Sequence, residues 1–170
     1  NTLVEQLLQL CSTQLEASEK IVDMLSIAKD VEKELTSSSI QAGMQIEIFG
    51  SAFADGNARL FHQIIFNLVQ NSIKYGQTGG HVHITLSNTN NSTVIKIEDD
   101  GPGIPSTARE HIFDAFYRVD HSRHRQIGGN GLGLAIVQRI VQQYNGSIVL
   151  EDSSMGGACF TVTLPYKISS

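Results

Sequence analysis

The sequence is poor in cysteine and has no long hydrophobic run. Its two cysteines, Cys11 and Cys159, lie near opposite ends of the chain, which favours unpaired thiols in a reducing compartment over a disulfide framework. No apolar run approaches the roughly 18 residues that span a bilayer, so we expect no segment to cross a membrane. The N-terminal stretch NTLVEQLLQL lacks the basic start and the cleavage site of a signal peptide.

Charge is also scarce: 17% of the 170 residues are charged and the net charge is -5. Because 41% of the residues are hydrophobic, the chain is too apolar to be intrinsically disordered. Its length is that of one ordinary globular domain. A pI near 5.6 argues against a non-specific nucleic-acid binder, which needs a concentrated basic surface.

Hydrophobic periodicity predicts helices that alternate with strands. Residues 1–17 have helical spacing but no cap, as in the tail of a longer helix. Further helices are predicted at 25–35, at 131–144, and from a cap at Asn57 to Tyr75. Strands are predicted at 20–24, 45–49, 81–87, 93–98, 147–151 and 158–164. This order predicts an α+β sandwich, with helices on one face of a mixed or antiparallel sheet.

Three polar residues follow one edge of the helix that Asn57 caps. Asn67, Asn71 and Lys74 are four and three residues apart, so their side chains share that edge. Two amide oxygens and an ammonium group can hold a hydrated Mg²⁺ ion and phosphate oxygens. The alternative is a polar helix face that only meets solvent.

Two glycine-rich segments offer backbone to a ligand. In 98–105, Gly101 and Gly103 allow a flat ligand to approach, and an adjacent carboxylate can accept a hydrogen bond from an amine, although a plain turn explains the segment equally well. Residues 128–134 run directly into a helix, whose N-terminus attracts anions. This second segment is neither a Walker loop nor a dinucleotide fingerprint, and a flexible hinge is its alternative.

Residues 101–130 have no convincing periodic strand, and loops of this length are usually functional or disordered. Three aromatic side chains, Phe113, Phe116 and Tyr117, precede Arg118 within it. They suggest the anchor of a lid, with packing under a static loop as the alternative.

In this order, the four segments resemble the N box, first glycine box, F box and second glycine box of sensor histidine kinases. Residues 156–160, followed by Leu164 and Pro165, resemble the closing glycine-rich strand of that family. The resemblance covers roughly residues 20–166. It implies a Bergerat ATP-binding fold over residues 18–170, with a mobile lid at 101–130. Residues 1–17 would then be the C-terminal stub of the dimerisation and phosphoacceptor helix.

The resemblance also implies roles for single residues. Asn71 would bind Mg²⁺, and Asn67 and Lys74 would line the triphosphate. Asp99 would accept a hydrogen bond from the adenine amino group, Tyr75 would lie beside the adenine, and Arg118 would reach the γ-phosphate. The glycine boxes would add Gly101, Gly103, Ile104, Gly129, Gly131, Leu132, Gly133 and Leu134. Asp100 falls at a variable position, and Asn57 stands where many relatives carry aspartate.

The function implied is phosphoryl transfer from Mg-ATP to a histidine on a domain absent from this chain, and then to an aspartate of a response regulator. The catalytic residues would be Asn67, Lys74 and Arg118. None of the six histidines lies in a phosphoacceptor motif. The parent protein would be a homodimeric, membrane-anchored sensor, with this domain in the cytoplasm and in contact with neither membrane nor nucleic acid.

Three alternatives remain at this point. ATPases of the same fold, such as gyrase B, MutL and the heat-shock chaperones, carry a glutamate four residues before the metal-binding asparagine. Here that position is Asn67, and an amide cannot accept a proton from water. A serine kinase of the anti-sigma type and a catalytically silent nucleotide-sensing module share the fold as well.

Overall fold

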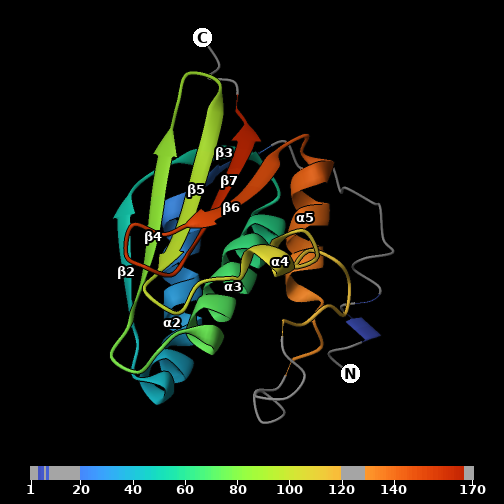
Figure 1. Cartoon of the computed structure of the whole chain (residues 1–170). Helices are drawn as coiled ribbons and strands as arrows, with labels where there is room; N and C mark the ends of the chain where they lie inside the picture. The colour runs from blue at the N-terminus through green and yellow to red at the C-terminus, as the bar shows by residue number, and fades with distance from the viewer. Residues whose placement is uncertain (1–3, 6, 8–19, 120–128, 167–170) are drawn as a thin grey trace.

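The computed structural model describes residues 4, 5, 7, 20–119 and 129–166, which form two layers (Figure 1). One layer is a five-stranded sheet in the order β2-β4-β5-β7-β6. Its strands are β2 (Gln45–Gly50), β4 (His81–Asn88), β5 (Ser92–Asp99), β6 (Ser147–Asp152) and β7 (Ala158–Pro165). Strands β2 and β4 are parallel and the other neighbours are antiparallel, so the sheet is mixed.

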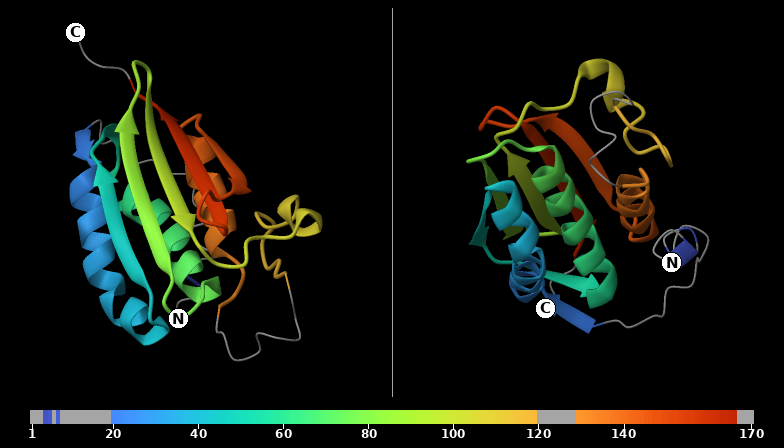
Figure 2. Two further views of the ribbon diagram at one scale, coloured as in Figure 1. Left: turned by 60° about the vertical axis from the view of Figure 1, so that its left-hand side comes forward. Right: turned by 90° about the horizontal axis from the view of Figure 1, so that it is seen from below.

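The second layer consists of α2 (Met24–Ala42), α3 (Ala58–Tyr75) and α5 (Gly133–Gln143). All three cover the same face of the sheet (Figure 2), which confirms the predicted α+β sandwich. A separate two-stranded sheet pairs β1 (Lys20–Asp23) with β3 (Phe53–Gly56). None of the helices in the described ranges is long and apolar enough to cross a bilayer.

Local capping explains where the helices begin and end. Asn57 caps α3 as predicted, since its side chain accepts a hydrogen bond from the Arg59 N–H at 2.9 Å. The predicted end of α2 at residue 35 is wrong, because the helix continues to Ala42 and ends at Gly43, which has a left-handed φ of 67°. Two hydroxyls of that extension, on Thr36 and Ser39, bond back to helix carbonyls at 2.9 Å. Strand β3, four residues long, was not predicted because it is too short to show a period.

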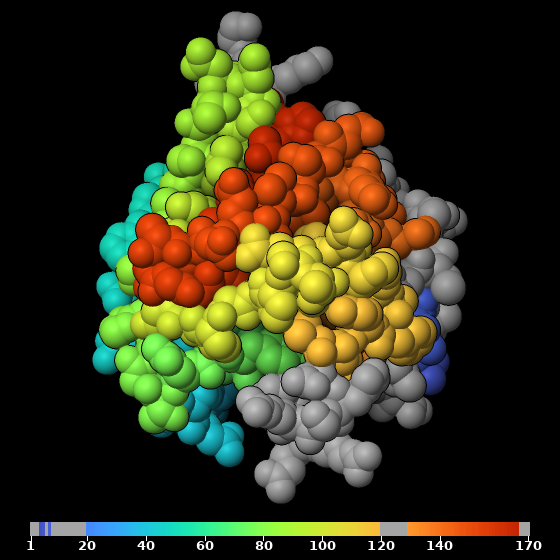
Figure 3. Space-filling view, in the orientation of Figure 1, coloured from blue at the N-terminus to red at the C-terminus, as the bar shows by residue number. Residues whose placement is uncertain are grey.

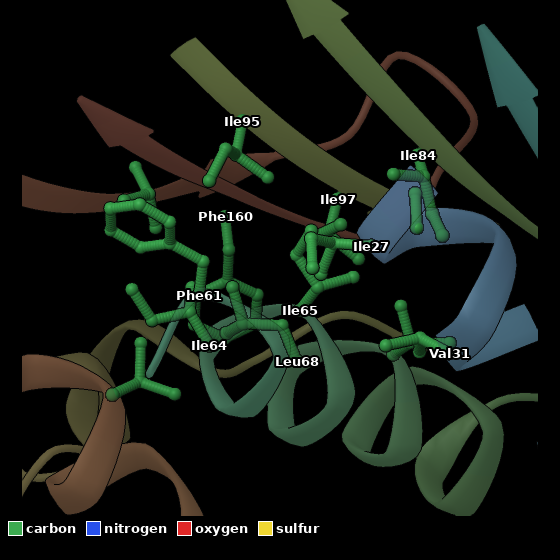
Figure 4. Packing of buried hydrophobic residues seen from close by; sticks show 14 of the residues in the cluster. Ile27, Val31, Phe61, Ile64, Ile65, Leu68, Ile84, Ile95, Ile97 and Phe160 are labelled. Carbon is green, nitrogen blue, oxygen red and sulfur yellow. The ribbon is translucent and has the colours of Figure 1, made fainter. Parts of the chain in front are cut away.

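The core lies between the sheet and the helices, with α3 at its centre (Figure 4). The buried face of α3 packs against the inner face of the sheet and against α2, through Phe61, Ile64, Ile65, Leu68, Ile84, Ile95, Ile97, Phe160, Ile27 and Val31. Each such side chain contributes about 1.5–3 kcal/mol when fully buried. This packing fixes the orientation of α3, and therefore of the polar edge that carries Asn71 and Lys74.

The predicted lid begins with residues that pack on the domain. A short helix, α4 (Ser106–Arg109), was not predicted, and Arg109 forms an ion pair with Asp152 at the end of β6. Ile112 is buried, and the Phe113 ring meets the Phe160 ring edge to face at 6.4 Å. In Figure 3 this segment (yellow) lies directly beside the turn between β6 and β7. Residues 120–128 of the predicted lid lie outside the described residues.

Candidate functional site

The centre of the candidate site is the carboxylate of Asp99, the last residue of β5, which is buried. Its Oδ1 accepts hydrogen bonds from two backbone N–H groups, those of Gly101 at 3.0 Å and Ala158 at 3.1 Å. The Asp99 carbonyl accepts a third from the Gly157 N–H at 3.1 Å. Within the described residues, Oδ2 accepts no hydrogen bond. One oxygen is therefore held by the protein and the other is available to a ligand donor.

Glycines surround this carboxylate because there is no space for side chains. A Cβ on Gly157 would overlap Asp99 Oδ1, and a Cβ on Gly101 would lie 3.1 Å from that atom. The Gly76 Cα lies 3.3 Å from the same Gly101 position, and a Cβ on Gly76 would overlap the thioether of buried Met44. Bare backbone next to a carboxylate suits a flat ligand with an amino group.

The polar edge of α3 meets the second glycine-rich segment. Asn67 is buried, so the alternative of a fully solvated face is wrong for this residue, whereas Asn71 and Lys74 are half-buried. A Cβ on Gly133, the first residue of α5, would lie 3.3 Å from Asn67 Oδ1. A Cβ on Gly129 would overlap Lys74 Nζ. The structure thus brings together two segments that are about 60 residues apart in the chain.

The described start of α5 leaves backbone N–H groups for an anion. No side chain from the described residues caps its first turn, and the first N–H groups of a helix have no partner within it. Just before it, the Leu132 N–H donates to Asn130 Oδ1 at 3.2 Å. Leu132 is fully buried, and Leu134 and Ile104 pack at the edge of the core.

The segment with Arg118 lies against the second glycine-rich segment. The Phe116 N–H donates to the Gly131 carbonyl at 3.0 Å, and a Cβ on Gly131 would lie 2.9 Å from Tyr117 O. Arg118 is half-buried, Phe116 is 55% exposed and Tyr75 is 40% exposed, with Lys74 Nζ 5.0 Å from the Tyr75 ring centroid. Gly103 has a φ of +73°, which favours glycine.

Sequence reasoning missed several residues that shape the site. It assigned no role to Gly76, to Gly157 or to the Ala158 N–H, although it placed the last two in a glycine-rich strand. Ala158 pairs with Asp99 only because β7 lies next to β5. No spacing in the sequence reveals that neighbour. The run Gly156-Gly157 was the one local signal of a close backbone approach.

The family model of the histidine kinase-, DNA gyrase B- and HSP90-like ATPases matches residues 56–168. The chain belongs to this family. The match contains the polar edge of α3, Asp99 and all the glycine-rich segments. It agrees with the resemblance inferred from the sequence and with the ATP-binding fold that the resemblance implied.

Similar proteins in this family include sensor histidine kinases. The chain is 41% identical over 116 residues to the sensor histidine kinase RppB of Synechocystis, covering 68% of this chain and 26% of RppB. It is 39% identical over 115 residues to CpxA of Escherichia coli, covering 67% of this chain and 25% of CpxA. The chain therefore spans about a quarter of the length of these relatives.

Solved structures of histidine kinases share the fold. The mycobacterial sensor histidine kinase MprB superposes with a TM-score of 0.75 at 25% identity, over 89% of this chain and 99% of that chain. Full-length ShkA in complex with AMPPNP gives 0.84 at 26% identity, over 99% of this chain and 36% of that chain.

Proposed function

We propose that this chain is the ATP-binding catalytic domain of a sensor histidine kinase, which positions Mg-ATP for transfer of the γ-phosphoryl group to a histidine on another domain. The observation that carries the proposal is that the C-terminal half of α3 meets Gly101, next to Asp99, on one side and Gly129 and Gly133, at the start of α5, on the other. The Asp99 carboxylate has one oxygen that accepts no hydrogen bond from the described residues, so it can bind a nucleobase. The junction of α3 with α5 can bind a triphosphate.

The Asp99 end suits adenine. Its Oδ2 accepts the hydrogen bond of the exocyclic amino group, while Oδ1 stays bound to the backbone. Gly101, Gly103 and Gly76 carry no side chain that would block a ring plane, and Tyr75 would lie beside it. A site built to accept from an amine rejects guanine, which presents a carbonyl at the same position, because two acceptors then face each other unpaired.

The α3–α5 end suits Mg²⁺ and phosphates. The amide oxygens of Asn71 and Asn67 are the hard donors that Mg²⁺ prefers, with phosphate oxygens and water completing its shell. The described residues contain no group of three or more His, Cys, Asp or Glu side chains that would hold an ion alone. An ion held jointly by amides and phosphates fits that composition, and when bound it neutralises phosphate charge.

Cationic and backbone groups orient the triphosphate. Lys74 acts as a point charge beside Gly129, and Arg118, which follows Tyr117 in the predicted lid, adds a second cation. The start of α5, with Gly133 and Leu134, offers its N–H groups, and Gly131 lies just before it, whereas the Leu132 N–H already donates to Asn130 Oδ1. Phosphoryl transfer depends mainly on such positioning and charge stabilisation, so Asn67, Lys74 and Arg118 are the proposed catalytic residues.

The site favours transfer over hydrolysis. Asn67 lies one turn before Asn71 and its amide cannot take a proton from an attacking water.

We propose the whole-protein context by similarity to sensor histidine kinases. It comprises a dimerisation and phosphoacceptor domain, a response regulator as partner, a homodimeric parent and a cytoplasmic position for this domain. The serine kinase and the silent nucleotide-sensing module remain the competing functions.

Labelled ATP tests the proposal. The isolated chain should bind Mg-ATP, hydrolyse it slowly and acquire no stable label. A separately added phosphoacceptor domain should become labelled on histidine, though weakly, because the effective concentration provided by the tether is lost. Stable label on this chain itself would overturn the assignment, and binding without transfer to any acceptor domain would favour the silent module.

A further inference from the structure

We propose that His81 and Asp100 form a positioning pair. The pair would hold in place the Asp99 carboxylate, which accepts the hydrogen bond from the adenine amino group. The inference rests on the proposed function, since it concerns the adenine end of the same site. It assigns a role to Asp100, which falls at a variable position of the family motif, and to His81, the first residue of β4.

Asp100 is the first residue beyond the ladder that joins β4 to β5. The last pair of that ladder is Val82 with Asp99, so no further strand pairing holds the chain after Asp99. Beyond that point, the side chain of Asp100 connects the end of β5 to the start of β4. Its Oδ1 accepts the His81 N–H at 2.9 Å, and its Oδ2 lies 3.1 Å from Nδ1 of the His81 ring. The Asp100 carbonyl accepts a third bond from Gln77 Nε2 at 3.1 Å.

The segment to which Asp100 is hydrogen-bonded, residues 76–81, is itself held by backbone hydrogen bonds. The Gly80 N–H donates to the Gln77 carbonyl at 2.9 Å, and the Gly79 N–H donates to the Gly43 carbonyl at 2.7 Å. The Gln45 N–H at the start of β2 donates to the Gly80 carbonyl at 2.9 Å. Asp100 therefore ties the end of β5 to the framework of α2 and β2, rather than to a free loop.

The same segment lines the site. A Cβ on Gly80 would lie 2.6 Å from Asp100 Oδ1, so the carboxylate packs against bare backbone. Gly76 begins the segment and lies 3.3 Å from the position of a Cβ on Gly101. Without the interactions of Asp100 with His81, the turn from Asp99 to Gly101 and the backbone at Gly76 on the other side of the site would be free to separate. The spacing that admits a purine ring would then change.

The charge of Asp100 supports this geometry. Burial alone raises the pKa of its carboxyl, but the hydrogen bonds from the His81 backbone and ring lower the pKa overall. The carboxylate is therefore ionised at neutral pH and accepts all its bonds without sharing a proton. Because 41% of the His81 side chain is exposed, we assign the effect to hydrogen-bond geometry rather than to charge attraction.

A second pair of a histidine and a carboxylate, with its histidine on the same strand as His81, provides the control. His83 Nε2 lies 3.6 Å from Glu47 Oε1, on β4 and β2, and neither residue takes part in the proposed site. We would measure Mg-ATP and Mg-GTP affinities by calorimetry, and the melting temperature, for wild type, Asp100→Ala, Asp100→Asn and Glu47→Ala.

Asp100→Ala should weaken ATP binding about tenfold, as expected for losing bonds to a charged group that positions Asp99, and should reduce the preference for ATP over GTP. Asp100→Asn keeps an acceptor for the His81 N–H and should lose less. Glu47→Ala should leave both affinities unchanged.

If Asp100→Ala and Asp100→Asn both bind ATP as wild type does, with unchanged preference, the pair is only structural and the inference fails. An Asp100→Ala chain that does not fold leaves Asp100→Asn to decide, through its nucleotide preference. A wild-type chain that does not bind ATP would instead overturn the proposed function.

Discussion

Replacing Gly157 by alanine should weaken nucleotide binding while the domain stays folded. The new Cβ would overlap Asp99 Oδ1 and lie 2.5 Å from the Asp99 carbonyl oxygen and 2.6 Å from the Gly101 nitrogen. Ordinary contacts between such atoms begin at about 3.5 Å, so the turn must shift by about 1 Å and the carboxylate oxygen by more. Rotation of the Asp99 side chain away from its two N–H donors relieves the overlap with Oδ1, whereas the two backbone contacts require the turn from Asp99 to Gly101 to shift as well.

The magnitude follows from the bond that is lost. A hydrogen bond to a charged acceptor contributes about 1.5–3 kcal/mol, so misplacing Asp99 should weaken ATP binding by about 10–100-fold. Overpacking of this kind destabilises a fold by about 1–3 kcal/mol, which a well-packed domain survives. Calorimetric titration with Mg-ATP, together with thermal unfolding, separates the two effects.

The neighbouring glycine is the control. Gly156 has a φ of +103°, and apart from its two chain neighbours no atom of the described residues lies within 4 Å of its Cβ position. Gly156→Ala therefore strains the backbone without touching Asp99, and it should lower the melting temperature while ATP affinity stays near the wild-type value. The reasoning is refuted if Gly157→Ala binds ATP as tightly as wild type, or if both variants lose affinity equally.

Three further predictions concern the rest of the site. Asn71→Asp adds a negative charge beside the triphosphate, so calorimetry should show weaker ATP binding and a reconstituted assay much slower transfer, with the melting temperature unchanged. A non-hydrolysable ATP analogue should increase amide-exchange protection in 101–119 and 129–131, and leave β2 unaffected. The lowered pKa of Asp100 means that its contribution to stability is present above the ordinary value of 3.8 and is lost as pH falls through the folded-state pKa. The melting-temperature difference between wild type and Asp100→Asn should therefore shrink in acid.

Each of these has a contrary outcome. Unaltered transfer by Asn71→Asp would make that residue part of a solvated surface. Equal protection of 101–119 with and without nucleotide would indicate a static loop, with Phe113 serving only to pack. A melting-temperature difference that grows below about pH 4 would contradict the assigned direction of the Asp100 pKa.

The sequence alone was sufficient where structure depends on near neighbours. The stripe of apolar residues on α3 and its cap at Asn57 follow from interactions within a few residues, and both are as predicted. The same reasoning failed at the end of α2, because the polar run after Leu35 has no apolar period. The helix ends instead at its C-cap, Gly43. It also missed β3, whose four residues are strand only through pairing with β1.

For the site, the sequence identified the motif residues but not the contacts that close the site around them. Asn67, Asn71 and Lys74 share an edge because the helical period puts them there. The contacts of Asp99 with Ala158 and of Asp100 with His81 join residues 59 and 19 positions apart. They exist only because β5 lies between β4 and β7 in the sheet. Strand order is determined by how whole faces pack against α3, and this global burial leaves no periodic trace at Asp100, Gly157 or Ala158 themselves.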